Sequence, residues 1–310
     1  MNSFIKIIVV LVVAVLIAGY LTLKQSTSVE TEVKKPSIAL STFSLYDIAT
    51  HISGDTLDPF MILPAGVDAH SFEPTPKLMI KIQESDLVVY SGVGLEPWIA
   101  NFAFKSKVID MSKHVKLKEL HQEDSHQHGE NCTHGAIDPH YWLDIQNMII
   151  ATDVITHELI KILPQNKELY MLNREKYVLM LKSLDKKYKT TLSGCKKDMI
   201  IVNHNAFSYL ASRYGFHVEA LSGLSPEAQP SAKNMLRLIE DVKEHDLKTI
   251  FFESFVSDKA IKSIANEVDV DVEVLYPLGN ITSEQLEKKY SFEDIMKINL
   301  QNISKALECQ

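Results

Sequence analysis

Cysteine is scarce in this chain of 310 residues, which has Cys132, Cys195 and Cys309. No two of them show C-x-x-C spacing, so a structural zinc site made of four cysteines is excluded. The count allows one disulfide with one cysteine left over. We favour Cys195–Cys309 as the pair, because Cys132 lies in a segment that we expect to be a flexible loop.

An excess of basic residues is also lacking. The net charge is -8 and the pI is about 5.8, whereas nucleic-acid-binding proteins normally carry a basic face. We therefore expect no nucleic-acid partner. The sequence contains no H-E-x-x-H or H-x-H-x-D motif and no nucleophile elbow, so the common signatures of hydrolases are missing.

The first 35 residues differ in character from the rest. Lys6 precedes an apolar run that begins at Ile7 and continues to Leu23, which is close to the ~20 residues needed to span a bilayer. A charged start followed by an apolar run is typical of an export signal. Residues 16–19 resemble the approach to a lipoprotein cleavage site, but Tyr20 stands where the lipidated cysteine would be. A cleaved signal and an uncleaved anchor through residues 7–23 both remain open, and both place the rest of the chain outside the cytoplasm.

From residue 36 onward, strands alternate with helices, which predicts an α/β fold with mostly parallel sheets. We expect strands at residues 38–43, 59–63, 86–90, 107–110, 199–203, 217–221, 249–253 and 271–276, with helices between them that include one at 96–104. Apolar residues recur at helical spacing from Leu169 and Leu172 to Tyr188. They predict one long helix over residues 166–193.

A helix of that length is longer than a small domain is wide, so we expect it to join two similar lobes. The predicted organisation is a signal or anchor with a tether (1–35), an N-terminal α/β lobe (36–165), the linking helix (166–194) and a C-terminal α/β lobe (195–310).

Three histidines occupy turns where a ligand would bind. His70 and His204 follow predicted strands, and ligands of open α/β sheets bind outside the carboxyl ends of strands. His140 follows the rigid Asp138-Pro139 turn and precedes Tyr141 and Trp142. Single histidines at such places are usually structural. Three together, beside a separate histidine-rich run, predict a zinc site in the cleft between the lobes.

The histidine-rich run lies directly before the third turn. It spans residues 121–134 and contains His121, His126, His128 and His134. A solvated loop without a function is one interpretation of this run. Histidine-rich tracts commonly bind metal, and we therefore interpret it as an accessory loop for the same ion.

Several phrases resemble the signatures of one family, the solute-binding proteins of zinc and manganese ABC transporters (cluster A-I), and most of all the high-affinity zinc uptake binding proteins. They extend from about residue 36 to the C-terminus and lie at residues 64–76, 92–98, 138–144, 224–231, 251–254 and 276–279. The resemblance implies two α/β lobes bridged by a rigid helix.

The resemblance also implies the ligands. The first three ligand positions of the family fall on His70, His140 and His204, and a histidine at the third position is typical of zinc-binding members. Many members have Asp or Glu at the fourth position, where this chain has Tyr276, a poor zinc ligand because its phenol ionises only near pH ~10. We expect water or Glu253 to complete the site. A smaller departure is Gln229, where the family usually has Glu.

The leading hypothesis is a periplasmic or otherwise extracytoplasmic protein that captures Zn²⁺ as cargo between its lobes. It would act as a monomer and deliver the ion to an ABC permease and its ATPase in the inner membrane. The alternatives are a manganese or iron carrier of the same family and a zinc-dependent hydrolase. Three histidines with an open fourth position would suit a hydrolase, but the missing motifs argue against an enzyme.

Overall fold

The computed structural model describes residues 8–17, 34–120, 136–224, 231–253 and 259–310. The chain divides into two compact units, residues 1–35 and 36–310. Residues 8–17 of the first unit are helical, with exposed apolar side chains. Within the described ranges, no helix combines the length and the apolar character that a bilayer crossing needs.

The first half of the second unit is built on a parallel sheet in the order β2-β1-β3-β4. Its strands are β1 (Ser37–Leu40), β2 (Asp58–Met61), β3 (Leu87–Tyr90) and β4 (Lys107–Asp110). Successive side chains of a strand point to opposite faces. Accordingly, Ile38 and Leu40 face the main core, while Ala39 lies in a smaller cluster with Trp98 and Phe102.

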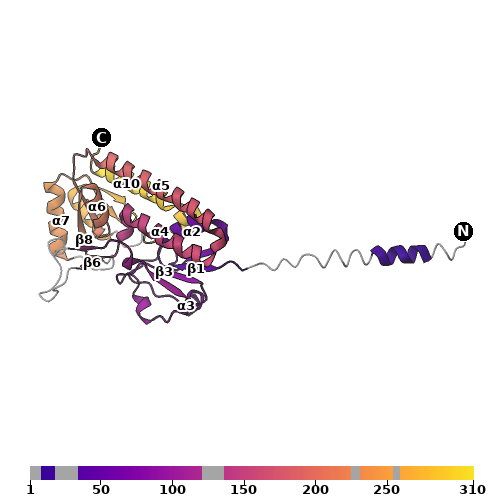
Figure 1. The fold of residues 1–310 in the computed structure, drawn as a ribbon. Coiled ribbons are helices and arrows are strands. Elements are labelled where there is room, and N and C mark those ends of the chain that lie inside the picture. Colours follow the sequence, from indigo (N-terminus) through magenta and orange to yellow (C-terminus); the bar gives the residue numbers. More distant parts are fainter. Residues whose placement is uncertain (1–7, 18–33, 121–135, 225–230, 254–258) are drawn as a thin grey trace. The chain divides into compact units, whose positions relative to one another are not determined.

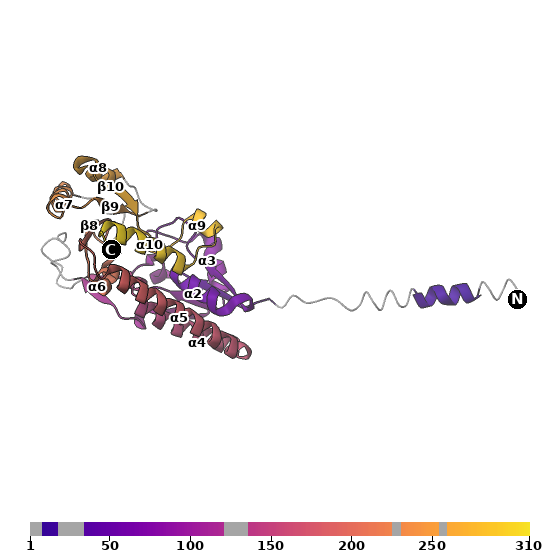
Figure 2. The same cartoon turned by 90° about the horizontal axis from the view of Figure 1, so that it is seen from above.

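Helix α2 (Phe43–Ser53) packs on the main-core face of this sheet, and two further helices, α4 (Ile145–Ile162) and α5 (Lys167–Leu192), pack against α2. Helix α3 (Pro76–Gln83) belongs to the other face, where its buried Ile82 packs. Helices α4 and α5 run side by side, and α5 also lies along α10 (Phe292–Ala306) (Figures 1 and 2). The predicted long helix is therefore confirmed, at 26 residues.

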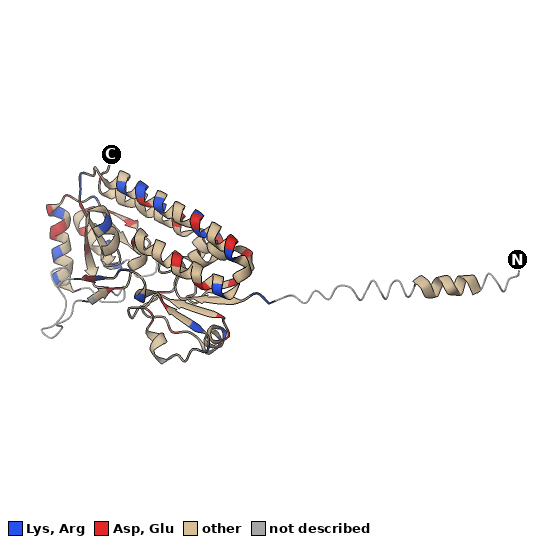
Figure 3. Cartoon of the chain, viewed as in Figure 1, with Lys and Arg blue, Asp and Glu red and all other residues tan. Residues whose placement is uncertain are grey.

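The buried face of α5 is rotated relative to our expectation at its beginning. Leu169 and Leu172 are exposed, and Tyr170 is buried instead, with its hydroxyl 2.6 Å from Oγ1 of Thr56. Further along, Tyr177, Leu181, Leu184 and Tyr188 are buried as predicted. Lysines and acidic residues occur along this helix (Figure 3).

The second half has two parallel strand pairs, which lie next to each other through β7 and β9. They are β7 (Met199–His204) with β8 (His217–Ser222), and β9 (Thr249–Phe252) with β10 (Asp271–Val274). Helices α7 (Ala232–Glu244) and α8 (Lys259–Val268) pack on one face, around Ile201, Leu238 and Ile250. Ile200 and Val202, on the other face, join the main core with α6 (Ser208–Tyr214) and α10.

This arrangement confirms the predicted α/β class with parallel sheets flanked by helices. The lobe boundaries at residues 165 and 194 remain a prediction, because residues 36–310 form a single compact unit. The disulfide Cys195–Cys309 is present and joins the residues that follow α5 to those that follow α10.

The predicted helix at residues 96–104 is wrong, since this segment is a short 3₁₀ helix, η2 (Pro97–Asn101). The carboxylate of Glu96 is buried and accepts hydrogen bonds from Ser91 N, Gly92 N and Ser41 Oγ at 2.8, 3.0 and 2.5 Å. These bonds fix the chain just before Pro97, and Trp98 and Phe102 then pack in the smaller cluster instead of forming a helical face. The sequence also did not reveal α9 (Ser283–Glu287) or the antiparallel pair β5 (Lys118–Leu120) and β6 (Ala136–Asp138).

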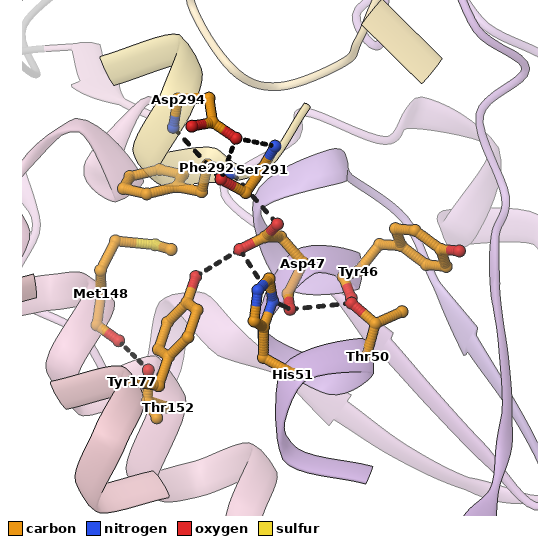
Figure 4. A network of polar contacts seen from close by, with 10 residues as sticks. All are labelled: Tyr46, Asp47, Thr50, His51, Met148, Thr152, Tyr177, Ser291, Phe292 and Asp294. Carbon is orange, nitrogen blue, oxygen red and sulfur yellow. Dashed lines mark hydrogen bonds and ion pairs between the residues drawn. The ribbon is translucent and has the colours of Figure 1, made fainter. Parts of the chain in front are cut away.

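A buried polar network joins the first helix of the fold to the last (Figure 4). The carboxylate of Asp47 on α2 accepts hydrogen bonds from Tyr177 Oη at 2.6 Å and from Phe292 N at 3.1 Å. His51 Nδ1 lies 3.4 Å from the same carboxylate. Burial raises the pKa of Asp47, although these partners oppose the shift. One side chain thus links α2, α5 and the beginning of α10, so elements from both halves of the chain share one core.

Candidate metal centre

His140 is held by a turn whose conformation the local sequence dictates. Asp138 is the last residue of β6, and its Oδ1 accepts hydrogen bonds from His140 N at 2.9 Å and from His140 Nδ1 at 2.8 Å. The other carboxylate oxygen of Asp138 accepts a hydrogen bond from Ser208 Oγ. Because Nδ1 is engaged, Nε2 of His140 is the nitrogen that remains for a ligand. His140 itself is 2% exposed.

His204 occupies the carboxyl end of β7, as predicted, and is also 2% exposed. Its Nδ1 lies against Oε1 of Glu253, which follows β9 and is 3% exposed, but the geometry between these two atoms is not that of a hydrogen bond. With Nδ1 facing Glu253, Nε2 is the nitrogen that faces the other ligands, 3.4 Å from His140 Nε2. An acidic side chain thus lies beside Nδ1 of both imidazoles, and at His140 it makes the hydrogen bond that fixes the orientation of the ring.

His70 lies on the loop between β2 and α3. Its backbone N donates a hydrogen bond to Asp68 Oδ1 at 2.7 Å, which closes the turn just before the histidine. The ring centroid of His70 is 5.4 Å from that of His140 and 6.1 Å from that of His204. The structure thus brings all three predicted histidines together.

The separations of the ligand atoms suit a tetrahedral ion. One nitrogen from each ring lies within 4.8 Å of the others, and His140 Nε2 and His204 Nε2 are 3.4 Å apart. Zn–N bonds of ~2.05 Å in a tetrahedron place two nitrogens about 3.3 Å apart. The His140–His204 edge therefore already has the required length, and a shift of about 1.7 Å or less would bring His70 into position.

The histidines line a cavity of about 30 Å³, together with Leu95, Trp142, Gly279 and Asn280. Glu253 also lines it, but one of its carboxylate oxygens is already engaged with His204. Tyr276 is not among the lining residues; its backbone is bound by Asn299 at 3.0 and 2.7 Å. Such a volume suits an ion with a water molecule and little else.

Burial sets the protonation of this site. Desolvation, followed by the effect of the neighbouring imidazoles, lowers the pKa of His70 to about 3. Desolvation, with His140 as the next cause, lowers the pKa of His204 to about 3. Desolvation raises the pKa of Glu253 well above its usual value. Neutral imidazoles are the form that coordinates a metal, so His70 and His204 are already in the coordinating form at neutral pH.

Comparison with known proteins decides the family. Residues 38–306 match the family described as "ZnuA: Zinc-uptake complex component A periplasmic". The chain belongs to this family. It is 33% identical over 288 residues to the high-affinity zinc uptake system protein ZnuA of Bacillus subtilis, and the match covers 90% of each chain.

A further relative, AdcA, comes from Streptococcus pneumoniae. The zinc-binding lipoprotein AdcA is 31% identical over 287 residues, a match that covers 88% of this chain and 56% of AdcA. The present sequence thus spans little more than half of the AdcA length. The crystal structure of the Zn(II)-bound ZnuA-like domain of AdcA has a TM-score of 0.72 and 30% identity, and the match covers 88% of this chain and 99% of that one.

Within this ZnuA-family chain, sequence reasoning missed the residues that support the ligands. Asp138 and Ser208 hold His140, but they are 70 positions apart, and no local signal connects them. Asp138 could have been found from its place two residues before His140, since an aspartate there can accept the histidine's backbone N–H. The predicted accessory histidines His121, His126, His128 and His134 lie outside the described residues.

Proposed function

We propose that this chain binds Zn²⁺ outside the cytoplasm and passes it to an ABC permease and its ATPase. The ligands would be Nε2 of His140, Nε2 of His204 and one ring nitrogen of His70. The observation that carries the proposal is the convergence of three imidazoles, of which His140 and His204 are buried and have an acidic side chain beside Nδ1. Membership of the ZnuA family and the zinc-bound AdcA structure support the same metal.

The donor set favours zinc over manganese. Imidazole nitrogens suit zinc, whereas manganese prefers carboxylate and water oxygens. Glu253 contacts His204 Nδ1 and so supports a ligand, and Tyr276 lies outside the cavity lining. We therefore propose water as the fourth ligand, with the second oxygen of Glu253 as its hydrogen-bond acceptor.

Transport rather than catalysis is the role that the cavity supports. A zinc hydrolase needs an open coordination position beside a substrate pocket and a general base. The cavity of about 30 Å³ has room for the ion and a water molecule, and the sequence carries none of the common hydrolase motifs. The disulfide Cys195–Cys309 agrees with an oxidising compartment outside the cytoplasm.

Metal content and competition binding test the proposal. We expect one tightly bound zinc per purified chain, which Mn²⁺ does not displace, and a severe loss of affinity in His140→Ala. His157→Ala is the matched control, because His157 is exposed on α4 and its Nδ1 contacts the carbonyl of Asp153. Zinc retained at full affinity in His140→Ala would refute the three-histidine site. Manganese that outcompetes zinc would refute the choice of cargo.

Uptake tests the transport role separately. Cells that lack this chain should accumulate less zinc under zinc limitation, and the wild-type chain but not His140→Ala should restore uptake. Restoration by the variant would contradict delivery through this site.

A further inference from the structure

Residues 276–281 lie late in the chain but bind elements of its first half. The carbonyl of Gly279 accepts a hydrogen bond from Phe43 N at 3.0 Å, and the carbonyl of Pro277 accepts one from Trp142 Nε1 at 2.6 Å. The carbonyl of Ile281 accepts one from Gly66 N at 2.9 Å. This segment therefore connects the second half of the fold to the loop that carries His70.

The side chain of Asn280 makes more hydrogen bonds than any other side chain of this segment. Its side chain is buried, and the residue is 5% exposed. Nδ2 donates hydrogen bonds to the carbonyls of Pro64 at 2.7 Å and Val67 at 2.6 Å, and Oδ1 accepts one from Ile281 N at 2.7 Å. Both amide protons are thus used on two carbonyls three residues apart, which fixes the path of the His70 loop.

The loop depends on such an anchor more than the other two ligand segments do. His140 is oriented by the carboxylate of Asp138 on Nδ1, and His204 belongs to a strand and lies against Glu253. His70 lies between β2 and α3 without either support, and its ring packs against the other two imidazoles. The loop includes Gly66 at a φ of 81°, a conformation that glycine adopts at little cost.

We propose that Asn280 is the positioning residue for His70. It holds the third imidazole near the other two before the ion binds. The loop therefore loses little conformational entropy on zinc binding, which increases the affinity. Asn280 also lines the cavity, so the same side chain borders both the His70 loop and the space for the ion. This inference rests on the proposed function, since it needs zinc as the ligand.

A double-mutant cycle tests the coupling. Zinc affinity is measured by chelator competition for wild type, Asn280→Ala, His70→Ala and the double variant. We expect Asn280→Ala to lose about 10–100-fold in affinity, the usual effect of removing a residue that orients a ligand. The double variant should bind no more weakly than His70→Ala alone, because Asn280 acts through His70.

A spectroscopic readout separates positioning from general destabilisation. Bound Co²⁺ reports its ligand set through its visible absorption, so Asn280→Ala should give the spectrum of His70→Ala. Asn302→Ala is the matched control: its Nδ2 donates to the carbonyl of Val274 at 2.9 Å, far along the chain from the His70 loop. Its affinity and spectrum should equal those of wild type.

The outcomes separate this inference from the proposed function. Zinc binding by wild type that is lost in His70→Ala but unchanged in Asn280→Ala overturns the inference alone. Losses that multiply in the double variant also overturn it. A wild-type chain that binds no zinc overturns the proposed function and the inference with it. If Asn280→Ala does not fold, Asn280→Ser retains one donor, and it should show an intermediate loss that again vanishes in the His70→Ala background.

Discussion

The charge of Asp138 is the feature of the metal centre that a single substitution isolates best. Asp138→Asn keeps the size and shape of the side chain. Its amide oxygen can still accept the two hydrogen bonds from His140. The bond with Ser208 reverses direction: Ser208 Oγ donates to the carboxylate in the wild type and would accept from the amide nitrogen in the variant. The substitution therefore removes a negative charge from behind a ligand without an obligatory change in geometry.

The expected magnitude follows from those contacts. A hydrogen bond to a charged group contributes about 1.5–3 kcal/mol, and one between neutral groups contributes about 0.5–1.5 kcal/mol. The difference, about 1–1.5 kcal/mol, corresponds to a loss of about 10-fold in zinc affinity. The loss arises because the carboxylate makes the coordinating imidazole more basic.

Chelator competition at pH 7.5 measures this loss. Asp153→Asn is the control, because it removes a carboxylate from the ion pair with Arg174 on a partly exposed part of α4 and α5. Urea unfolding without metal checks that both variants remain folded. Zinc affinity of Asp138→Asn within a factor of about two of wild type would refute the argument that this carboxylate acts on the metal through His140.

Three further predictions concern stability. In the metal-free chain the pKa of His204 is about 3. Between pH 6.5 and 3 its imidazole is therefore protonated in the unfolded state but neutral in the folded state. The His204 contribution to folded stability therefore decreases as the pH falls, by about 1.6 kcal/mol between pH 6.5 and 5, and His204→Gln should lose correspondingly less in urea unfolding at the two pH values. Tyr177→Phe removes a donor to the carboxylate of Asp47 and should cost more in urea unfolding than Tyr188→Phe, whose hydroxyl donates to a backbone carbonyl at 2.6 Å; equal costs would contradict a charged acceptor. Replacing Cys195 and Cys309 by serine opens a loop with a sequence separation of 114 and should lower the free energy of unfolding by about 2–5 kcal/mol, while zinc affinity stays within a few-fold of wild type. Calorimetry measures the first effect and chelator competition the second; unchanged stability or a large loss of zinc affinity would contradict the prediction.

The fold was predictable where the sequence carried a strong local pattern. Apolar strands alternating with amphipathic helices gave the α/β class, and the spacing from Tyr177 to Tyr188 gave the long helix. Predictions failed where a distant contact overrides the local pattern. Glu96 is the clearest case, because its bond to the distant Ser41, together with its bonds to the nearby Ser91 and Gly92, fixes the chain where the helix was expected.

The same distinction separates the ligands from their supports. His70, His140 and His204 could be selected because each follows a recognisable strand or turn. The supporting contacts form only when separate strands and helices come together, as in the pairs Asp138–Ser208 and His204–Glu253. Asn280 lies more than 200 positions from the loop that it binds, and no spacing rule connects residues so far apart.

The disulfide has a consequence for the order of events during biosynthesis. Synthesis proceeds from the N-terminus at about 5–20 residues per second, so Cys195 precedes its partner by about 6–23 s for a separation of 114 residues. During that interval the only earlier cysteine is Cys132. The non-native pair Cys132–Cys195 is therefore the first one that translation makes available. Correct pairing requires either oxidation after Cys309 has emerged or exchange of an earlier bond.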